Sequence, residues 1–126
     1  MSVSLPKPEL GIILFAHGSR DALWRLPTEA VATRIRQRSP GVAVRCAYLE
    51  LCAPSLADAA TDLIALGARK IRVFPLFLGV GKHAREDLPQ LMAQLNDGHR
   101  EIDFELLATA GENAALIALL ADLAVS

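Results

Sequence analysis

Three side chains that bind metal ions or transfer protons are the candidates for chemistry in this sequence: His17, Glu50 and His83. Neutral imidazole is a ligand for borderline divalent cations such as Co²⁺, Fe²⁺ and Ni²⁺, and it accepts protons near neutral pH. A carboxylate can orient an imidazole or relay its proton. The three residues are far apart in the sequence, so only the fold can bring them together.

The elements that would position these residues follow from hydrophobic patterning. Short apolar runs predict strands at 11–16, 42–49, 71–74 and 102–107. Segments with helical spacing separate them: a helix that begins at Pro27, one after Pro54, one marked by Leu88 to Leu95 and ended by the turn 96–98, and one over 112–123. The apolar stripe predicted for the first helix consists of Leu23, Leu26, Ala30, Val31 and Ile35.

This alternation predicts an α/β fold in three layers, with a four-stranded parallel sheet and helices on both faces. The first strand is wholly apolar and should be central, whereas Asp103 and Glu105 place the fourth strand at an edge. Strand order 2-1-3-4 satisfies both expectations.

In such a sheet, ligands bind beyond the carboxyl ends of the strands, near the point where the chain order reverses. His17 follows the first strand, Glu50 ends the second, and His83 comes after the third. The fold therefore predicts that two imidazoles and one carboxylate converge at one edge. His99 precedes the fourth strand, at the opposite end, and is assigned to the solvated surface.

Each candidate also has a purely structural interpretation. His17 could be a buried histidine with satisfied hydrogen bonds, and Glu50 could be a surface carboxylate. Gly18 and Ser19 could serve only to turn the chain and cap a helix, and His83 could cap the third helix. A phosphotransfer role for His17 is a distant alternative, because Ala16 stands where a phosphate-binding Arg would be needed.

The segment 75–81 (PLFLGVG) is longer and more apolar than a strand-to-helix connection needs to be. One interpretation is that the third strand runs on to Leu78. The other is an apolar lip that receives a flat hydrophobic ligand, with Arg20, Lys82 and Arg85 around it to meet anionic groups.

Composition sets the broad class. The chain has 126 residues, is 52% hydrophobic and carries 13 basic and 14 acidic side chains, which predicts one domain over 1–126 with an N-terminal extension, 1–10. A net charge of −1 without a basic stripe excludes nucleic acid as an expected partner. No apolar run could span a membrane, and residues 1–10 do not resemble a signal peptide. Two cysteines without a CxxC spacing favour a cytoplasmic protein with free thiols.

Three motifs together resemble one known family. They are AHGSRD at 16–21, AYLE at 47–50 followed by Pro54, and FPLFL at 74–78 followed by Gly81, His83, Asp87 and Pro89. In this order they resemble the class II tetrapyrrole chelatases, and above all the short CbiX/SirB type that acts on sirohydrochlorin. The resemblance extends from about Gly11 to the last helix.

The resemblance implies an enzyme that inserts a divalent metal, Co²⁺ before Fe²⁺ or Ni²⁺, into sirohydrochlorin in cobalamin or sirohaem biosynthesis. The family's paired histidines match His17 and His83, as catalytic and metal-binding residues, and its assisting acid matches Glu50. The expected substrate-binding residues are Ser19, Arg20, Leu78, Gly79, Lys82 and Arg85. The metal is a substrate, no tightly bound cofactor is expected, and a homodimer is. The alternative is a non-catalytic carrier of metal or tetrapyrrole on the same fold.

Overall fold

A computed structural model describes residues 8–126, so most of the expected N-terminal extension, 1–7, lies outside the described residues, and Leu10 belongs to the first strand. The strands are β1 (Leu10–Ala16), β2 (Ala43–Tyr48), β3 (Lys70–Pro75) and β4 (Asp103–Leu106). The α-helices are α1 (Leu26–Arg38), α2 (Leu56–Ala65), α3 (Lys82–Gly98) and α4 (Ala114–Val125), and the short 3₁₀ helices are η1 (Ala22–Arg25) and η2 (Ala110–Glu112).

The strands form one parallel sheet in the order β2-β1-β3-β4, as the sequence predicts. β1 is central: Phe15 pairs with Ala47 on one side and with Pro75 on the other. The apolar β1 is therefore buried, whereas β4 lies at an edge, where Glu105 forms ion pairs with Lys70 and Arg72 of β3. All three side chains are about 40% exposed, so these ion pairs stay in contact with water even though Lys70 and Arg72 extend from an inner strand.

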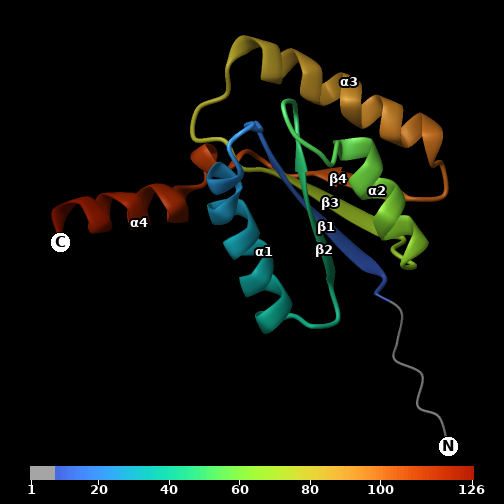
Figure 1. Ribbon diagram of the computed structural model, residues 1–126, viewed down its shortest axis with the longest axis horizontal. Helices are drawn as coiled ribbons and strands as arrows, with labels where there is room; N and C mark the ends of the chain where they lie inside the picture. Colours follow the sequence, from blue (N-terminus) through green and yellow to red (C-terminus); the bar gives the residue numbers. More distant parts are fainter. Residues whose placement is uncertain (1–7) are drawn as a thin grey trace, which may run out of the picture.

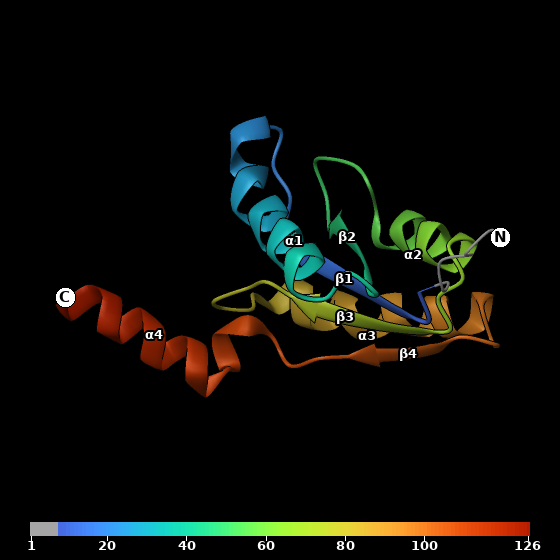
Figure 2. The same ribbon diagram turned by 90° about the horizontal axis from the view of Figure 1, so that it is seen from below.

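Helices cover both faces of the sheet, so the three-layer prediction is confirmed (Figures 1 and 2). α2 and α3 pack on one face, where Ile13, Phe15, Leu63, Ile71 and Met92 belong to the main core. α1 packs on the other face, around the smaller cluster of Leu14, Ala32 and Val44. The central strand contributes to both cores, which fixes the position of its carboxyl end and of the residues that follow it.

The apolar stripe predicted for the first helix is wrong in its details. Thr28 and Ala32 are the buried residues of α1 and Ile35 is half-buried, whereas Leu23, Leu26 and Val31 are exposed. Leu23 belongs to η1, which the sequence patterning did not predict. The face of α1 toward the sheet is thus made of small side chains, and larger apolar ones are left on the surface.

α4 extends away from the rest of the chain, with the C-terminus at its far end (Figures 1 and 2). The helix forms over the residues expected, within two positions, but none of its residues is buried. Its main contacts within the chain are with η2. No helix within residues 8–126 combines the length and apolarity needed to cross a bilayer.

Candidate active site at the carboxyl edge of the sheet

The loops after β1 and β2 run side by side beyond the ends of their strands. The backbone N–H of Leu49 donates to the carbonyl of Ala16 (2.9 Å), and that of Glu50 donates to the carbonyl of His17 (3.1 Å). These bonds continue the parallel ladder past both strand ends. The ladder therefore places His17 next to Glu50, although 32 other residues separate them in the sequence.

The side chains of His17 and Glu50 are in direct contact, with Nε2 of His17 2.9 Å from Oε1 of Glu50. A carboxylate only accepts hydrogen bonds, so Nε2 carries the proton and donates it. In the neutral imidazole, Nδ1 then holds a free lone pair. Just over half of each side chain is exposed, so the pair is accessible, and the alternative interpretation of His17 as a buried histidine is wrong.

Gly18 makes this contact possible. Its φ is +106°, a conformation that residues with a side chain rarely adopt. A Cβ at this position would lie 1.8 Å from the carbonyl oxygen of Glu50. The sequence analysis treated Gly18 only as a turn residue. Its signal is the small residue directly after His17, at the point where the two loops approach most closely.

His83 begins α3 near the same edge of the sheet, as its second residue, and is exposed. It does not form a three-residue metal site with His17 and Glu50. Within residues 8–126, no three His, Cys, Asp or Glu side chains cluster closely enough to hold one metal ion. The structure thus brings together two of the three predicted residues. The third lies on a neighbouring element whose first turn contains no buried residue except Ala84.

Ser19 acts within its own loop, as one of the structural interpretations proposed. Its Oγ accepts a hydrogen bond from the backbone N–H of Asp21 (3.1 Å), and Asp21 in turn accepts one from the N–H of Leu23 at the start of η1. The loop that carries His17 is thereby ordered by two successive side-chain caps. The third histidine, His99, follows the far end of α3, where it packs on Phe104 and is half-buried rather than fully solvated.

The segment after β3, 76–81, is called the lip here, and its role in receiving a flat ligand stays a prediction. β3 ends at Pro75, so the alternative of a strand continuing to Leu78 is wrong. The ring of Phe77 is buried edge-on against Phe15, at a centroid distance of 6.3 Å, and anchors the segment. Leu78 is 71% exposed at the tip, and Gly79 beside it is also exposed.

η2 supports the lip from beneath. The N–H of Gly111 donates to the carbonyl of Phe77 (2.8 Å). A Cβ on Gly111 would lie 1.7 Å from the carbonyl oxygen of Leu78, so the two segments touch backbone to backbone. The position of the lip is therefore fixed by the β4–α4 connection as well as by the core beneath Phe77.

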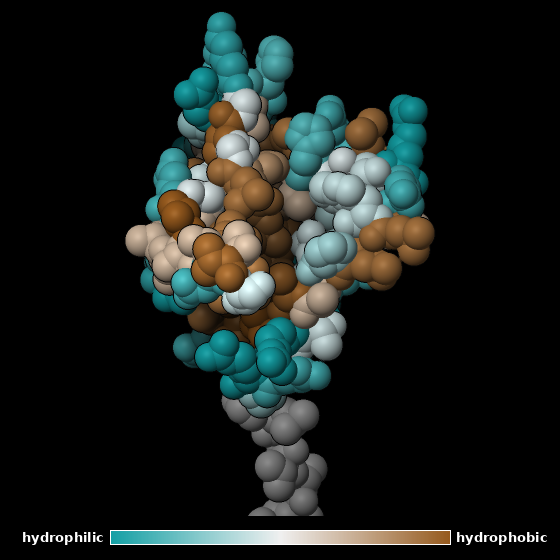
Figure 3. All heavy atoms as spheres, turned by 90° about the vertical axis from the view of Figure 1, so that its left-hand side faces the viewer, coloured by the Kyte–Doolittle hydropathy of each residue, from teal (hydrophilic) through white to brown (hydrophobic). Residues whose placement is uncertain are grey.

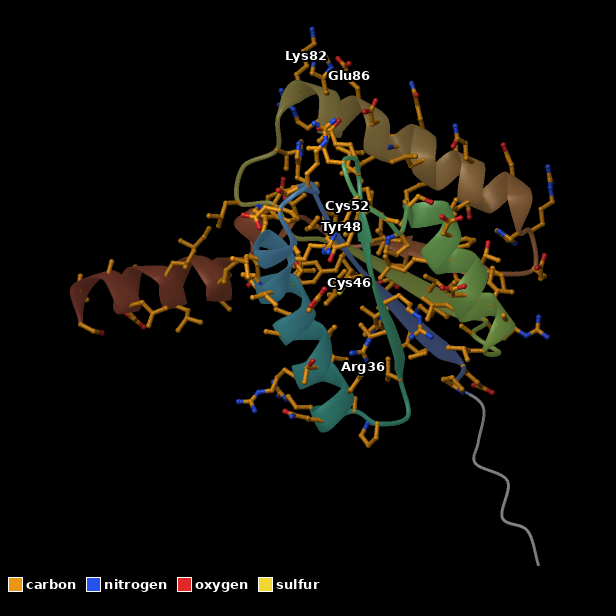
Figure 4. The ribbon with its side chains drawn as sticks, in the orientation of Figure 1. Arg36, Cys46, Tyr48, Cys52, Lys82 and Glu86 are labelled. Carbon is orange, nitrogen blue, oxygen red and sulfur yellow. The ribbon has the colours of Figure 1, made fainter. Side chains whose placement is uncertain are left out.

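Three basic side chains lie on the segments that follow β1 and β3. Arg20 lies in the loop after β1, and Lys82 and Arg85 lie in the first turn of α3; all three are exposed. None forms an ion pair with another side chain among residues 8–126. Figure 4 shows Lys82 pointing outward from the start of α3. These charges are free to meet an anionic ligand.

Tyr48 is a residue that the sequence analysis included in a motif but gave no role. It ends β2, is 3% exposed, and its ring lies 6.1 Å from that of Trp24 on η1. Burial, helped by Cys46 and Glu29, raises the pKa of its hydroxyl to about 12. Figure 4 shows Tyr48 between Cys46 and Cys52, along β2 and into the loop that carries Glu50.

Comparisons with known proteins point to one family. The family described as CbiX matches residues 11–125. Sirohydrochlorin cobaltochelatase of Methanococcoides burtonii is 29% identical over 91% of each chain. That of Methanothermobacter thermautotrophicus is 33% identical over 78% of this chain and 69% of its own. The chloroplastic sirohydrochlorin ferrochelatase of Arabidopsis thaliana is 30% identical over 89% of this chain and half of its own.

Solved structures share the fold. A CbiX protein from Marinobacter aquaeolei VT8 superposes with a TM-score of 0.79 at 33% identity, over 92% of this chain and 94% of that one. The sirohydrochlorin chelatase SirB from Bacillus subtilis subspecies spizizenii, in complex with cobalt, has a TM-score of 0.73 at 22% identity. This chain covers 51% of SirB, so the same fold occupies about half of a longer protein.

Proposed function

The chain belongs to the CbiX family, and we propose that it is a sirohydrochlorin chelatase that inserts a divalent metal ion into the tetrapyrrole. The observation that carries this proposal is the exposed contact between His17 and Glu50 at the carboxyl edge of the sheet. A half-exposed acid–base pair at this edge suits a reaction that moves both a metal ion and protons.

Metal insertion requires that the ion lose water and that two pyrrole N–H protons leave the macrocycle. The hydrogen bond to Glu50 holds the proton of His17 on Nε2 and leaves Nδ1 as a metal ligand or proton acceptor. A carboxylate behind an imidazole also stabilises the imidazolium that forms when a proton is accepted. In this scheme Glu50 passes protons between His17 and solvent, to which both side chains are open.

We assign to His83 the second imidazole of the site. It lies in the first turn of a helix whose preceding segment is the lip, so its approach to the metal and the position of the macrocycle are coupled. The substrate-binding part of the proposal uses Leu78 and Gly79 against the face of the ring. Arg20, Lys82, Arg85 and the hydroxyl of Ser19 would meet carboxylates of the tetrapyrrole.

The proposed metal is Co²⁺, with Fe²⁺ or Ni²⁺ as further substrates, in cobalamin or sirohaem biosynthesis. Imidazole and carboxylate ligands suit all three ions. Two of the relatives above are named cobaltochelatases and one a ferrochelatase, which supports a choice within this group. The proposal also includes a single domain over residues 1–126, with 1–10 as an N-terminal extension, a cytoplasmic location and a homodimer.

The proposal is tested by mixing purified protein with sirohydrochlorin and Co²⁺ and following the change in the absorption spectrum. We expect turnover above the buffer rate, and a loss of roughly 100-fold or more in His17→Ala and His83→Ala. His99→Ala is the matched control, because it removes an imidazole at the other end of α3 and should retain the full rate. Binding of Co²⁺ and tetrapyrrole without turnover would instead identify a carrier.

A further inference from the structure

Two large apolar side chains are exposed on the segments that carry the His17–Glu50 pair. Trp24 lies on η1, which follows the loop of His17, and is 39% exposed. Leu51 directly follows Glu50 and is 50% exposed. Neither residue belongs to the two apolar cores of the described residues. Packing of the cores therefore does not explain why apolar side chains stand at these two positions.

The indole of Trp24 is anchored against the end of β2 and remains partly open to solvent. Its ring lies 6.1 Å from that of the buried Tyr48, at an interplanar angle of 60°. Tyr48 ends β2 two residues before Glu50, so the indole has a fixed position relative to the pair. η1 is itself ordered by Asp21, whose side chain accepts a hydrogen bond from the N–H of Leu23. A rigidly held, half-open aromatic ring can pack against a flat ligand at little cost in conformational entropy.

The backbone of Leu51 adopts an unusual conformation. Its φ is +70°, in the left-handed region that glycine and asparagine occupy far more readily than leucine. Among the non-glycine residues of 8–126, no other has a positive φ. Strained conformations of this kind cluster at functional sites. A half-exposed leucine here costs stability without filling a core, which points to a contact that its side chain makes with a ligand.

The strand order places Leu51 and the lip on opposite sides of His17. β1, which precedes His17, pairs with β2 on one side and with β3 on the other. Leu51 follows β2, and Leu78 at the tip of the lip follows β3. Trp24 lies on the β2 side as well, since η1 stands beside the loop that follows β2 (Figures 1 and 2).

The spacing of these apolar side chains matches a flat macrocycle. Neighbouring strands lie about 4.8 Å apart, so the ends of β2 and β3 are separated by roughly 10 Å, which is the scale of a ring of four pyrroles. Figure 3 views the molecule from the side at which these strands end, and shows apolar side chains gathered in a hollow between two lobes. A ring centred over His17 would therefore rest on Leu78 at one side and on Leu51 and Trp24 at the other.

Two guanidinium groups accompany the indole. Arg20 lies in the loop before η1, and Arg25 ends η1. Neither forms an ion pair with another side chain within residues 8–126. An aromatic side chain between two positive charges suits a flat, conjugated molecule with carboxylates at its rim, and would not select an uncharged apolar partner. The tetrapyrrole substrate proposed above has this chemistry.

We propose that Trp24 and Leu51 form a platform for the tetrapyrrole on the β2 side of His17, opposite the lip. The platform binds and orients the macrocycle over the His17–Glu50 pair and takes no part in proton transfer. This inference rests on the proposed function, because its ligand is the proposed substrate. It can nevertheless be tested without metal insertion, since the platform should bind metal-free sirohydrochlorin.

The first test is a titration of the full chain with metal-free sirohydrochlorin, followed by the absorption spectrum of the tetrapyrrole. We expect Trp24→Ala to raise the dissociation constant roughly 10-fold, and Trp24→Phe, which keeps an aromatic ring, to stay within about 3-fold of the wild type. Leu66→Ala is the matched control: Leu66 is 42% exposed at the end of α2, before β3 and thus at the other edge of the sheet. In the insertion assay, Trp24→Ala should raise the KM for tetrapyrrole more than it lowers kcat.

Leu51→Asn separates binding from folding. Asparagine is close to leucine in size and adopts a positive φ more readily, so this variant should be at least as stable as the wild type in urea unfolding. It lacks the apolar surface, and we expect its dissociation constant for metal-free sirohydrochlorin to rise roughly 3- to 10-fold. A weaker affinity in a protein of undiminished stability cannot come from loss of structure.

A spectroscopic signature reports the contact directly. Trp24 is the only tryptophan in the chain, so its indole N–H gives a single NMR signal. A conjugated macrocycle shields nuclei that lie over its face, and this shielding falls steeply with distance. Saturation with metal-free sirohydrochlorin should therefore move the indole signal upfield, whereas the backbone amide of Leu66 should not move.

Wild-type affinity in both Trp24→Ala and Leu51→Asn, or an indole signal that stays in place at saturation, would overturn the platform. The chelatase proposal would then still stand if the wild type inserts metal. A wild type that binds no tetrapyrrole would overturn both proposals. A wild type that binds the tetrapyrrole through Trp24 and Leu51 but inserts no metal would contradict the chelatase proposal alone.

Discussion

At the scale of single residues, a substitution at Glu50 can distinguish two contributions of this side chain. One is its contact with His17, and the other is its negative charge. Glu50→Gln keeps the length of the side chain and can still accept a hydrogen bond from Nε2. It cannot stabilise an imidazolium or relay a proton. We therefore expect metal insertion by Glu50→Gln to fall roughly 10- to 100-fold, with the fold unchanged.

The measurement is the insertion rate at saturating Co²⁺, together with the Co²⁺ concentration that gives half of that rate. Glu86→Gln is the control, because Glu86 is an exposed carboxylate on α3 that forms no ion pair with the other described residues. A Glu50→Gln variant as fast as the wild type would show that the carboxylate only holds the ring in place, and the proton-relay role would be lost.

Of the candidate residues, those fixed by strand ends could be predicted from the sequence. His17 and Glu50 each follow a strand whose apolar pattern is clear, and a parallel sheet brings carboxyl ends together. His83 follows a six-residue connection, 76–81, whose course no periodicity determines. The distance of His83 from His17 and Glu50 depends on that course. The sequence therefore predicted that His83 lies at the carboxyl edge of the sheet, but not how close it comes to the other two residues.

At the scale of elements, the loops after β1 and β2 depend on each other through Gly18. Gly18→Ala would force a Cβ into the carbonyl of Glu50 at a positive φ. We expect a loss of roughly 1–3 kcal/mol in the free energy of unfolding, and a fall in insertion rate because Glu50 is displaced from His17. Urea unfolding measures the first and the insertion assay the second.

Gly41→Ala is the control for this substitution. Gly41 lies in the turn before β2, where an added Cβ would meet nothing within 4 Å. This variant should be as stable as the wild type or slightly more stable, since alanine restricts the unfolded chain. If Gly18→Ala behaves like Gly41→Ala, the close approach of the two loops does not constrain the site.

The sequence predicted most elements because each has a local signal. Ser55 caps α2 through its hydroxyl, as the Pro-Ser pair at 54–55 suggests, and the apolar runs give the strands. The turn expected at 96–98 is instead the end of α3. The N–H of His99 still donates to Leu95, so the helix continues through residues that favour turns. Side-chain propensity was outweighed there by one more turn of backbone hydrogen bonds.

At the scale of the whole molecule, α4 marks the limit of sequence reasoning. Its leucine spacing indicates a helix that must be buried, and the helix forms. Nothing in the pattern says which surface buries it, because the hydrophobic effect has no direction. An expectation that every helix packs on its own sheet fails for this one, whose first turns line an apolar groove together with Val31 of α1 and Phe74 of β3.

The ionisation of Tyr48, which ends β2 just before the loop that carries Glu50, makes the stability of the fold depend on pH. Its hydroxyl has an ordinary pKa of 10.0, and burial raises the pKa to about 12 in the folded protein. A raised pKa means that the folded state binds this proton more tightly than the unfolded state does. The resulting stability is fully present below pH 10 and is lost as the pH rises toward 12.

We therefore expect the wild type to lose roughly 2 kcal/mol of its free energy of unfolding over this range through Tyr48 alone. Tyr48→Phe keeps the ring against Trp24 but has no proton to lose, so its stability should decline less steeply. Urea unfolding of both proteins at neutral and alkaline pH measures the difference between the two slopes, from which titrating groups that do not interact with Tyr48 cancel. Cys46 interacts with Tyr48, so the same comparison is repeated in a Cys46→Ala background.

Tyr48 is also the only tyrosine in the chain, so the tyrosinate absorbance band reports its ionisation directly. In the folded protein the band should rise with a midpoint about two pH units above that of the urea-unfolded chain. Coincident midpoints, or equal slopes for the wild type and Tyr48→Phe, would show that the ring is solvated. The end of β2, and with it the loop that carries Glu50, would then be less tightly packed than the contact with Trp24 implies.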